Sequence, residues 1–185
     1  SFEIAEIAEQ CGAETPFIRP DALAKDDVPD FPVVEHCLEF LKQKENWIPE
    51  LLVFLRPTMP TRKPEEIVEC LRLIKSNPNI DCVRTTFPTL YPPYWIKKRD
   101  GEGFLEPFCE DVRPYQHLRS QDLPETVICD GYVDVCRVSA IKKYSQVVAG
   151  KIFACHQKDR IYVDLDEEKD WRYAEYLIQE LKKSQ

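Results

Sequence analysis

Two aspartates stand one residue apart near the end of the chain, in the stretch YVDLDEEKDWRYAEYL at residues 162–177. The first half alternates apolar and acidic residues as a strand does, and the second half has the spacing of a helix. Residues two apart on a strand point the same way, so Asp164 and Asp166 are expected to project together from the strand tip. Open α/β sheets place ligands at that edge, where two carboxylates suit Mg²⁺ bound to phosphate.

A simpler structural interpretation exists for the same two residues. Asp166 would cap the last helix with its carboxylate, and Asp164 would be solvated at the surface. On spacing alone we favour this second interpretation, so a metal-binding role needs support from other parts of the chain.

Cationic and hydroxyl side chains follow another expected strand, in the stretch LRPTMPTR. Arg56 leaves the apolar run ELLVFLR, Thr58 offers a hydroxyl, and Arg62 comes next. A guanidinium at a strand tip suits a bidentate contact with a carboxylate or a phosphate. An ordinary Pro-rich turn is a serious alternative here. Arg19 in FIRPDALAKDD and Gln121 in LRSQDLP are further polar residues in loops, and each is a weak signal alone.

Alternating helices and strands must position these groups. Apolar periodicity predicts helices near residues 2–11, 31–45, from Pro64 onward, 139–145 and 167–183, with Asp30 as the cap of the second. Continuous or alternating apolar runs predict strands at 50–56, 80–87, 131–138, 150–157 and 160–166. This succession indicates parallel βα units, and 185 residues fit one α/β domain with a small excursion.

The excursion is expected at residues 88–118, which are rich in proline and aromatic residues. Within them, WIKKRDGEGFLEPF predicts a hairpin that turns at Asp100–Gly103. An arm of this kind usually packs on its own domain or on a partner subunit.

The composition argues against several classes of protein. A net charge of −8 is unsuited to a general nucleic-acid or membrane-surface binder, although a small anionic substrate needs only local cations. No apolar run is long enough to cross a bilayer, and the first residues, SFEIAEIAEQ, predict an amphipathic helix instead of a signal peptide. The eight cysteines form no CxxC pair, which favours buried thiols in a reducing cytosol over a zinc site.

Six segments, taken in order, are similar to the acylneuraminate cytidylyltransferases, which are the CMP-sialic acid synthetases and their relatives for legionaminic, pseudaminic and other nonulosonic acids. The segments are FIRPDALAKDD with PDFPVVEHCLEFL, LLVFLRPTMPTRKPEEI, CVRTTFP, PPYWIKK, RSQDLPETVICDGYVDV and YVDLDEEKDWRYAE. They cover nearly the whole chain. The resemblance implies a Rossmann-like nucleotide-diphospho-sugar transferase fold of the GT-A-like kind, a three-layer sandwich around a mostly parallel sheet.

The resemblance also implies a reaction, the Mg²⁺-assisted transfer of CMP from CTP to the anomeric hydroxyl of an acidic nine-carbon sugar with release of pyrophosphate. The family holds its metal with a VDID-like motif. This chain has VDLD, so Asp164 and Asp166 inherit the metal-binding and catalytic role. Arg19 would face the nucleotide phosphates, while Arg56 and Thr58 would line the sugar side.

The remaining implied contacts involve a second subunit. Residues 88–118 correspond to the dimerisation arm inserted in a single cytidylyltransferase domain that spans 1–185. In such a homodimer one subunit completes the sugar pocket of the other, with Lys97 or Lys98 as the cation there. Gln121 would also approach the sugar. The implied enzyme is cytoplasmic and binds neither nucleic acid nor membrane.

The chain departs from the family in one large respect. The family opens with a strand and a phosphate-cradling loop that resembles RxGSKxxPxKN, whereas Ser1 corresponds to a point past the second strand. We therefore expect an N-terminally truncated domain, either a fragment or a truncated product, that alone turns over no CTP and folds poorly or associates. Met59 also replaces the usual serine of PTSP, which leaves the sugar's identity open.

Two alternatives follow from this departure. One is another sugar nucleotidyltransferase of the same fold, such as a 3-deoxy-manno-octulosonate cytidylyltransferase. The other is a non-catalytic dimerising remnant that keeps the arm without the nucleotide half. The missing loop favours the remnant, and the retained VDLD pair favours the enzyme.

Overall fold

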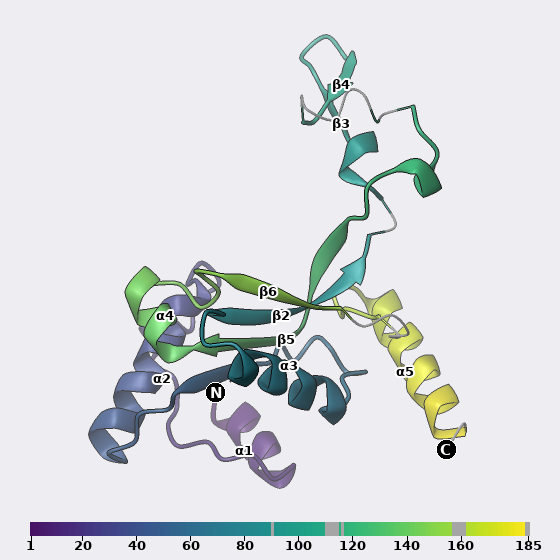
Figure 1. Ribbon diagram of the computed structural model, residues 1–185. Helices are drawn as coiled ribbons and strands as arrows, with labels where there is room; N and C mark the ends of the chain where they lie inside the picture. Colours follow the sequence, from purple (N-terminus) through teal and green to yellow (C-terminus); the bar gives the residue numbers. More distant parts are fainter. Residues whose placement is uncertain (90, 110–114, 116, 157–161, 184–185) are drawn as a thin grey trace.

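The computed structural model describes the chain except residues 90, 110–114, 116, 157–161 and 184–185 (Figure 1). A four-stranded sheet with the order β1-β5-β2-β6 forms its centre. The strands are β1 (Leu51–Phe54), β2 (Cys82–Pro88), β5 (Val127–Arg137) and β6 (Ile152–His156). β1, β2 and β6 run in one direction, and β5 runs antiparallel to both of its neighbours. The sheet is therefore mixed and not mostly parallel in its pairing, because β5 is a reversed strand between β1 and β2 that the βα rhythm did not indicate.

All five expected helices form, each within a few residues of its predicted bounds. They are α1 (Phe2–Gln10), α2 (Asp30–Lys44), α3 (Pro64–Ser76), α4 (Val138–Tyr144) and α5 (Glu168–Lys183), with short 3-10 turns η1 (Asp21–Leu23), η2 (Pro93–Trp95) and η4 (Ser120–Asp122). The prediction that Asp30 caps α2 is wrong. Pro29 is the N-cap and makes no side-chain hydrogen bond, while Asp30 is the first helical residue. Its carboxylate instead pairs with Arg56.

Helices cover both faces of the sheet, which gives three layers. The side chains of β1 alternate between them, because successive residues of a strand point to opposite faces. Leu51 and Val53 pack in the cluster that contains Cys70 and Ile74 of α3. The other face carries a second cluster, formed by Leu52 and Phe54 of β1 with Val34 and Leu38 of α2 and Val138 and Ile141 of α4.

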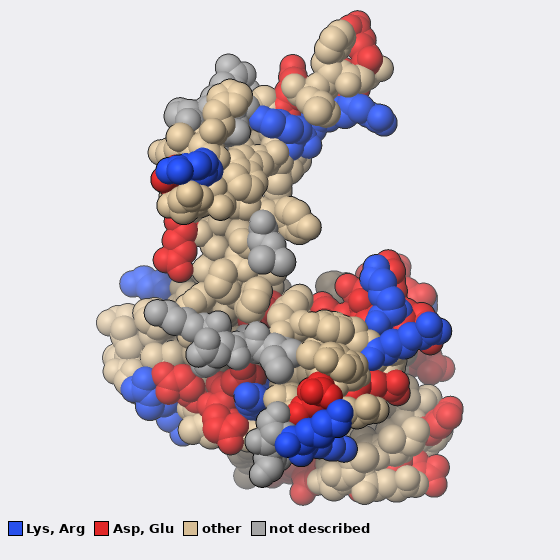
Figure 2. Space-filling model, turned by 90° about the vertical axis from the view of Figure 1, so that its right-hand side faces the viewer, with Lys and Arg blue, Asp and Glu red and all other residues tan. Residues whose placement is uncertain are grey.

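The expected hairpin stands at the end of a long arm (Figure 1). β3 (Lys97–Arg99) and β4 (Leu105–Pro107) pair antiparallel. The Asp100 carboxylate closes the turn by accepting hydrogen bonds from the backbone N–H groups of Glu102 and Phe104, both at 2.9 Å. Gly103 adopts a φ of +101°, which favours glycine. Figure 2 shows the arm standing clear of the body on a stem with few charged residues.

The strand expected over residues 160–166 is not seen in the part of it that the structure describes. Residues 160 and 161 lie outside the described residues, and 162–165 have no strand pairing. Single contacts hold this stretch instead. The backbone N–H of Val163 donates to the Tyr132 hydroxyl at 3.2 Å, and that of Leu165 donates to the carbonyl of Thr58 at 3.0 Å. Ala174 and Leu177 of α5 pack against its apolar side chains.

Two further expectations can be compared with the structure. The interpretation of the cysteines as buried thiols holds for Cys70, Cys82, Cys136 and Cys155, whereas Cys37 is half-buried and Cys11, Cys109 and Cys129 are exposed. The apolar stripe of α1, in contrast, covers nothing, since Phe2 is 80% exposed and Ile4 69%. Among the described helices, none combines the length and apolar character needed to cross a bilayer.

Candidate active site

One edge of the sheet gathers the ends of β1, β2 and β6 and the beginning of β5. At this edge β5 bulges away from β2. Arg84 lies opposite Asp134 and Thr86 lies opposite Cys129, so residues 130–133 of β5 face only one residue of β2. Such a bulge bends a strand and reorients its side chains, often beside a functional site.

Hydrogen bonds to buried side chains fix the shape of the bulge. The Asp130 carboxylate, 2% exposed, accepts from the Thr85 hydroxyl at 2.5 Å and from the backbone N–H of Tyr132 at 3.1 Å. The Thr85 hydroxyl in turn accepts from the Val133 N–H at 3.0 Å. Gly131 has a φ of +73°, and a Cβ there would approach the Arg56 side chain to 3.4 Å. The positive φ of the bend is what favours glycine here, since a Cβ would be in ordinary contact with Arg56.

The loop that follows β1 is clamped onto this bulge by an arginine. Arg62 donates from Nε to the Tyr132 carbonyl at 2.5 Å and from Nη2 to the Arg56 carbonyl at 2.6 Å. Burial lowers the pKa of the Arg62 guanidinium, although an arginine stays protonated in proteins. Arg62 is therefore a structural residue of the loop, and Arg56 and Thr58 are held in place by it.

The aspartate segment is held to the same loop. The buried Tyr132 hydroxyl hydrogen-bonds the Thr61 hydroxyl and accepts from the Val163 N–H, while Thr58 accepts from the Leu165 N–H at 3.0 Å. The residues that make these contacts, Val163 and Leu165, alternate with Asp164 and Asp166 along the segment. The VDLD segment and the Arg-bearing loop, far apart in the sequence, thus lie side by side at the sheet edge.

Asp164 and Asp166 present carboxylates of different exposure. Asp164 is half-buried, and its buried Oδ1 has no hydrogen-bond partner among the residues that the structure describes, whereas Asp166 is exposed. Burial raises the pKa of the Tyr162 hydroxyl, and the negative charges of Asp164, Asp130 and Asp166 raise it further. The phenol is therefore surrounded by negative charge. A buried carboxylate oxygen without a partner is costly unless a cation or a donor meets it.

This arrangement fits a magnesium ion shared with a ligand. Within the described part of the chain, no group of three or more His, Cys, Asp or Glu side chains is arranged to hold a metal alone. Mg²⁺ is commonly bound by one or two carboxylates, with waters and substrate phosphates completing the shell. Asp164 and Asp166 are hard oxygen donors of that kind.

The capping interpretation of Asp166 is wrong in its choice of residue. Asp170, in the first turn of α5, accepts hydrogen bonds from the backbone N–H groups of Asp166 at 3.1 Å and Glu167 at 2.7 Å. The helix start is thus capped by Asp170. The side chain of Asp166 is not needed for that task.

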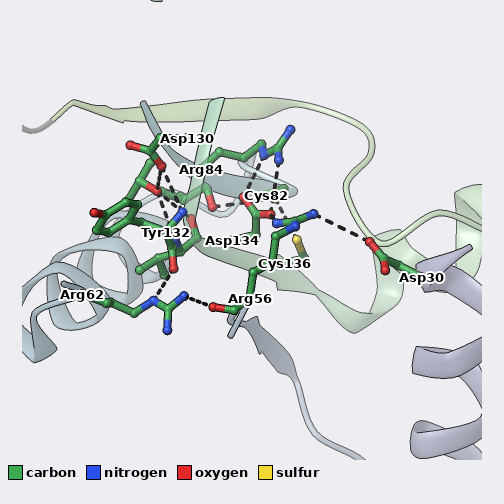
Figure 3. A network of polar contacts seen from close by, with 12 residues as sticks. Asp30, Arg56, Arg62, Cys82, Arg84, Asp130, Tyr132, Asp134 and Cys136 are labelled. Carbon is green, nitrogen blue, oxygen red and sulfur yellow. Dashed lines mark hydrogen bonds and ion pairs between the residues drawn. The ribbon is translucent and has the colours of Figure 1, made fainter. Parts of the chain in front are cut away.

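Sequence reasoning missed the most buried charges of this edge. Asp134 is fully buried and accepts from Arg56 Nη1 at 2.9 Å and from Arg84 Nε at 2.7 Å (Figure 3). A usable signal existed, since Arg84 and Asp134 each interrupt an otherwise apolar strand. Charged residues are almost never buried unless they are paired. Opposite charges in two adjacent buried strands therefore indicate an ion pair.

The remaining predicted site residues make no contact with this edge that the described residues show. Arg19 is exposed in the loop between α1 and η1. Lys97 lies in β3 and Gln121 in η4, both exposed on the arm. Met59, which replaces the usual serine, is 3% exposed in the core beside Gly131. Its side chain fills space inside the protein.

Comparisons with curated proteins support the resemblance over part of the chain. The CMP-N,N'-diacetyllegionaminic acid synthase of Legionella pneumophila is 31% identical over 105 residues, which are 57% of this chain and 44% of that protein. The N-acylneuraminate cytidylyltransferase of Escherichia coli O18:K1:H7 is 28% identical over 115 residues, which are 62% of this chain and 26% of that protein. The chain thus spans less than half the length of either relative. No family model matches.

Solved structures confirm the fold. The CMP:2-keto-3-deoxy-manno-octonic acid synthetase complexed with CTP gives a TM-score of 0.57 at 11% identity, covering 96% of this chain and 78% of its own. The 4-diphosphocytidyl-2C-methyl-D-erythritol synthase of Anaerococcus prevotii gives 0.51 at 12% identity, covering 86% and 74%. The expected nucleotidyltransferase-like α/β architecture is confirmed, as is the resemblance to the acylneuraminate cytidylyltransferases.

Proposed function

We propose that this chain is a portion of a Mg²⁺-dependent cytidylyltransferase that transfers CMP from CTP to a sialic or related nonulosonic acid. The names of both curated relatives support a product of this kind. The observation that carries the proposal is the hydrogen bond of 3.0 Å between Leu165 and Thr58, which places the aspartate pair beside the loop that carries Arg56.

The proposed reaction breaks a phosphoanhydride bond of CTP and forms a phosphate ester bond to the sugar. The anomeric hydroxyl oxygen of the sugar forms a bond to the α-phosphorus of CTP, the bond from that phosphorus to the bridging oxygen breaks, and pyrophosphate leaves with its electron pair. The hydroxyl proton passes to solvent. Asp164 and Asp166 would hold the magnesium ion, which when bound offsets the repulsion between the two anionic substrates.

The chain's own residues orient the reactants in this proposal. Backbone contacts of Val163 and Leu165 leave the aspartate side chains available for cations. Arg56 and Thr58 line the sugar side, and Arg19 serves the nucleotide phosphates. For Arg19, an exposed position in this chain means that other parts of the enzyme must bring the phosphates to it.

A homodimer is part of the proposal, because Lys97 and Gln121 lie on the arm. Apolar side chains are exposed near its tip, with Phe104 67%, Leu105 71% and Phe108 63% exposed. Exposed apolar groups of this kind favour a protein contact. We propose that the arm docks on a second subunit and brings these two residues to that subunit's sugar.

The test is turnover by a chimera, since the chain corresponds to less than half of its relatives. The N-terminal segment of the Legionella relative that carries its phosphate loop is fused ahead of Ser1, and formation of CMP-sugar is followed with labelled CTP. We expect product from the chimera and none from residues 1–185 alone. N-acetylneuraminate, N,N'-diacetyllegionaminate and 3-deoxy-manno-octulosonate, offered in parallel, separate the proposed substrate class from its nearest alternative.

The metal assignment is tested in the same chimera. Asp164→Asn should lower turnover by about 10²-fold or more, as loss of electrostatic stabilisation generally does. Glu175→Gln, an exposed carboxylate change on α5, is the control and should leave turnover unchanged. A chimera that folds and dimerises yet makes no product with any sugar would instead favour the non-catalytic dimerising remnant.

A further inference from the structure

Two arginines of this edge share one buried carboxylate. Asp134 accepts from Arg56 Nη1 at 2.9 Å, from Arg84 Nε at 2.7 Å and from Arg84 Nη2 at 3.3 Å (Figure 3). The Asp134 side chain is 1% exposed, whereas those of Arg84 and Arg56 are 20% and 33% exposed. The carboxylate therefore anchors one side of each guanidinium and leaves the rest of it toward solvent.

The exposed sides of both arginines line a cleft. It has a volume of about 450 Å³ and lies between the start of α2 and the residues that follow α4. Phe31 and Val147 give it apolar walls, and Ser145 and Gln146 add polar groups. A cleft of this size with a few polar groups at one end is typical of sites for small organic molecules.

The charges beside the cleft favour the binding of one anion. Arg56 and Arg84 carry two positive charges, and Asp134 neutralises one of them. The other is met by Asp30, whose Oδ2 lies 3.6 Å from Arg56 Nη2 and whose side chain is 56% exposed. An exposed ion pair at that distance is weak. The positive end of the α2 dipole lies at the same place, because the helix begins at Asp30 without a side-chain cap.

We propose that Arg84, together with Arg56, binds the carboxylate of the acidic sugar in this cleft, and this rests on the proposed function. Asp134 is a positioning residue that holds both guanidiniums. Asp30 occupies the anion position in the free protein and is displaced by the ligand. Arg84 is thereby a specificity-determining residue, which selects sugars with a carboxylate over neutral ones.

A carboxylate suits the cleft better than a phosphate does. The net charge of one, before Asp30 is counted, balances a single negative charge. A planar guanidinium binds either oxyanion through two parallel N–H donors, so the charge balance is what favours the carboxylate. Both Arg84 Nε and Nη2 already bond the carboxylate of Asp134, which leaves its remaining donors for the ligand. A phosphate is also an oxyanion but carries more negative charge. The experiment therefore compares the sugar carboxylate with CTP and pyrophosphate.

The experiment measures binding of N-acetylneuraminate to the chimera described above by calorimetry, without CTP or metal. The methyl ester of the same sugar is the uncharged comparison, and the wild-type chain should prefer the acid. Arg84→Gln should weaken binding of the acid about tenfold or more and leave the ester nearly unchanged, because a hydrogen bond to a charged group is lost. Arg84→Lys keeps the positive charge but lacks the paired N–H donors of a guanidinium. Its affinity for the acid should fall between those of the wild-type chain and Arg84→Gln.

Asp30→Asn gives the opposite prediction and keeps the proposal testable if the arginine variants fold poorly. Removing the competing carboxylate should strengthen binding of the acid, by up to about fivefold for an exposed pair. The matched control is Arg72→Gln, which removes an exposed arginine that pairs with Glu69 on α3. Arg72→Gln should change neither the affinity for the acid nor the affinity for the methyl ester.

Several outcomes would overturn the proposal. Equal affinity for acid and ester, or weaker acid binding in Asp30→Asn, would do so. So would an Arg84→Gln chain that loses affinity for CTP or pyrophosphate and keeps it for the sugar acid, since the cleft would then serve phosphate. CMP-sugar formation by the chimera with an unchanged KM for sugar in Arg84→Gln would sink this inference and leave the proposed function standing. Selective binding of the sugar acid by a chimera that shows no turnover would support this inference and contradict the proposed function.

Discussion

The arginine cleft and the aspartate segment lie at the same edge of the sheet and are held in opposite ways. At the cleft, side chains bond to side chains, and Asp134 satisfies both Arg56 and Arg84. At the segment, backbone N–H groups make the hydrogen bonds, and the buried Asp164 Oδ1 has no partner within the described part of the chain. The first region is held in shape by the protein itself. The second offers carboxylate oxygens that a cation could bind. The arginine cleft is thus a preorganised binding surface, whereas the aspartate segment needs a bound cation to satisfy its side chains.

The largest test of this comparison is the removal of Asp134. Asp134→Ala leaves two partly buried arginines without their shared partner, so the free energy of unfolding should fall by about 3 kcal/mol or more. Denaturation by urea, followed by circular dichroism, measures the change. Glu69→Ala breaks an exposed pair with Arg72 and should lower the free energy of unfolding far less. Equal losses in the two variants would mean that the cleft is no more preorganised than the surface.

A middle-sized effect is expected from the link between the two regions. Tyr132→Phe removes the hydroxyl that contacts Thr61 and the Val163 N–H. Leaving these buried groups unpaired should lower the free energy of unfolding by about 1–3 kcal/mol. Hydrogen exchange at the Leu165 amide should speed up at the same time, because the segment is then held by fewer contacts. Unchanged exchange at that amide would show that Tyr132 does not hold the aspartate segment.

The smallest effect is a change in the acidity of Tyr162. Burial and the charges of Asp164, Asp130 and Asp166 raise its pKa, and Asp164→Asn removes one of those charges. The pKa of Tyr162 should move down toward its ordinary value and remain above it, because burial persists. Carbon-13 NMR titration of labelled tyrosines measures it, with Tyr91 as an exposed reference. A higher pKa in the variant would contradict the placement of Asp164 beside the phenol.

The same shift predicts a dependence of stability on pH. The neutral phenol of Tyr162 is favoured in the folded chain, so its contribution to stability is full below the unfolded pKa near 10. That contribution is lost as the pH rises from there through the folded pKa. Tyr162→Phe should therefore reduce the loss of stability in this alkaline range. A loss of the same size in both chains would assign the alkaline effect to other groups.

The sequence predicted the elements better than their pairing. Helices and strands follow local apolar periodicity, and α1 to α5 with β1, β2, β5 and β6 lie where it placed them. The strand expected over 160–166 was wrong in its described part because alternation of apolar and acidic residues does not require a ladder. The same alternation is satisfied by a segment pinned between Tyr132 and Thr58 with α5 packed on it.

The amino-acid sequence by itself determined which residues could do chemistry, namely a carboxylate pair, an arginine after a buried strand and an arm with a defined turn. These follow from residue type and spacing, which are local properties. Only the tertiary structure decided which of them meet. The bulge at 130–133, the reversed direction of β5 and the shared bond of Arg56 and Arg84 to Asp134 all join residues far apart in the sequence, as with Arg56 and Asp134, which are 78 positions apart. Such contacts depend on the sheet's register, which no local pattern specifies.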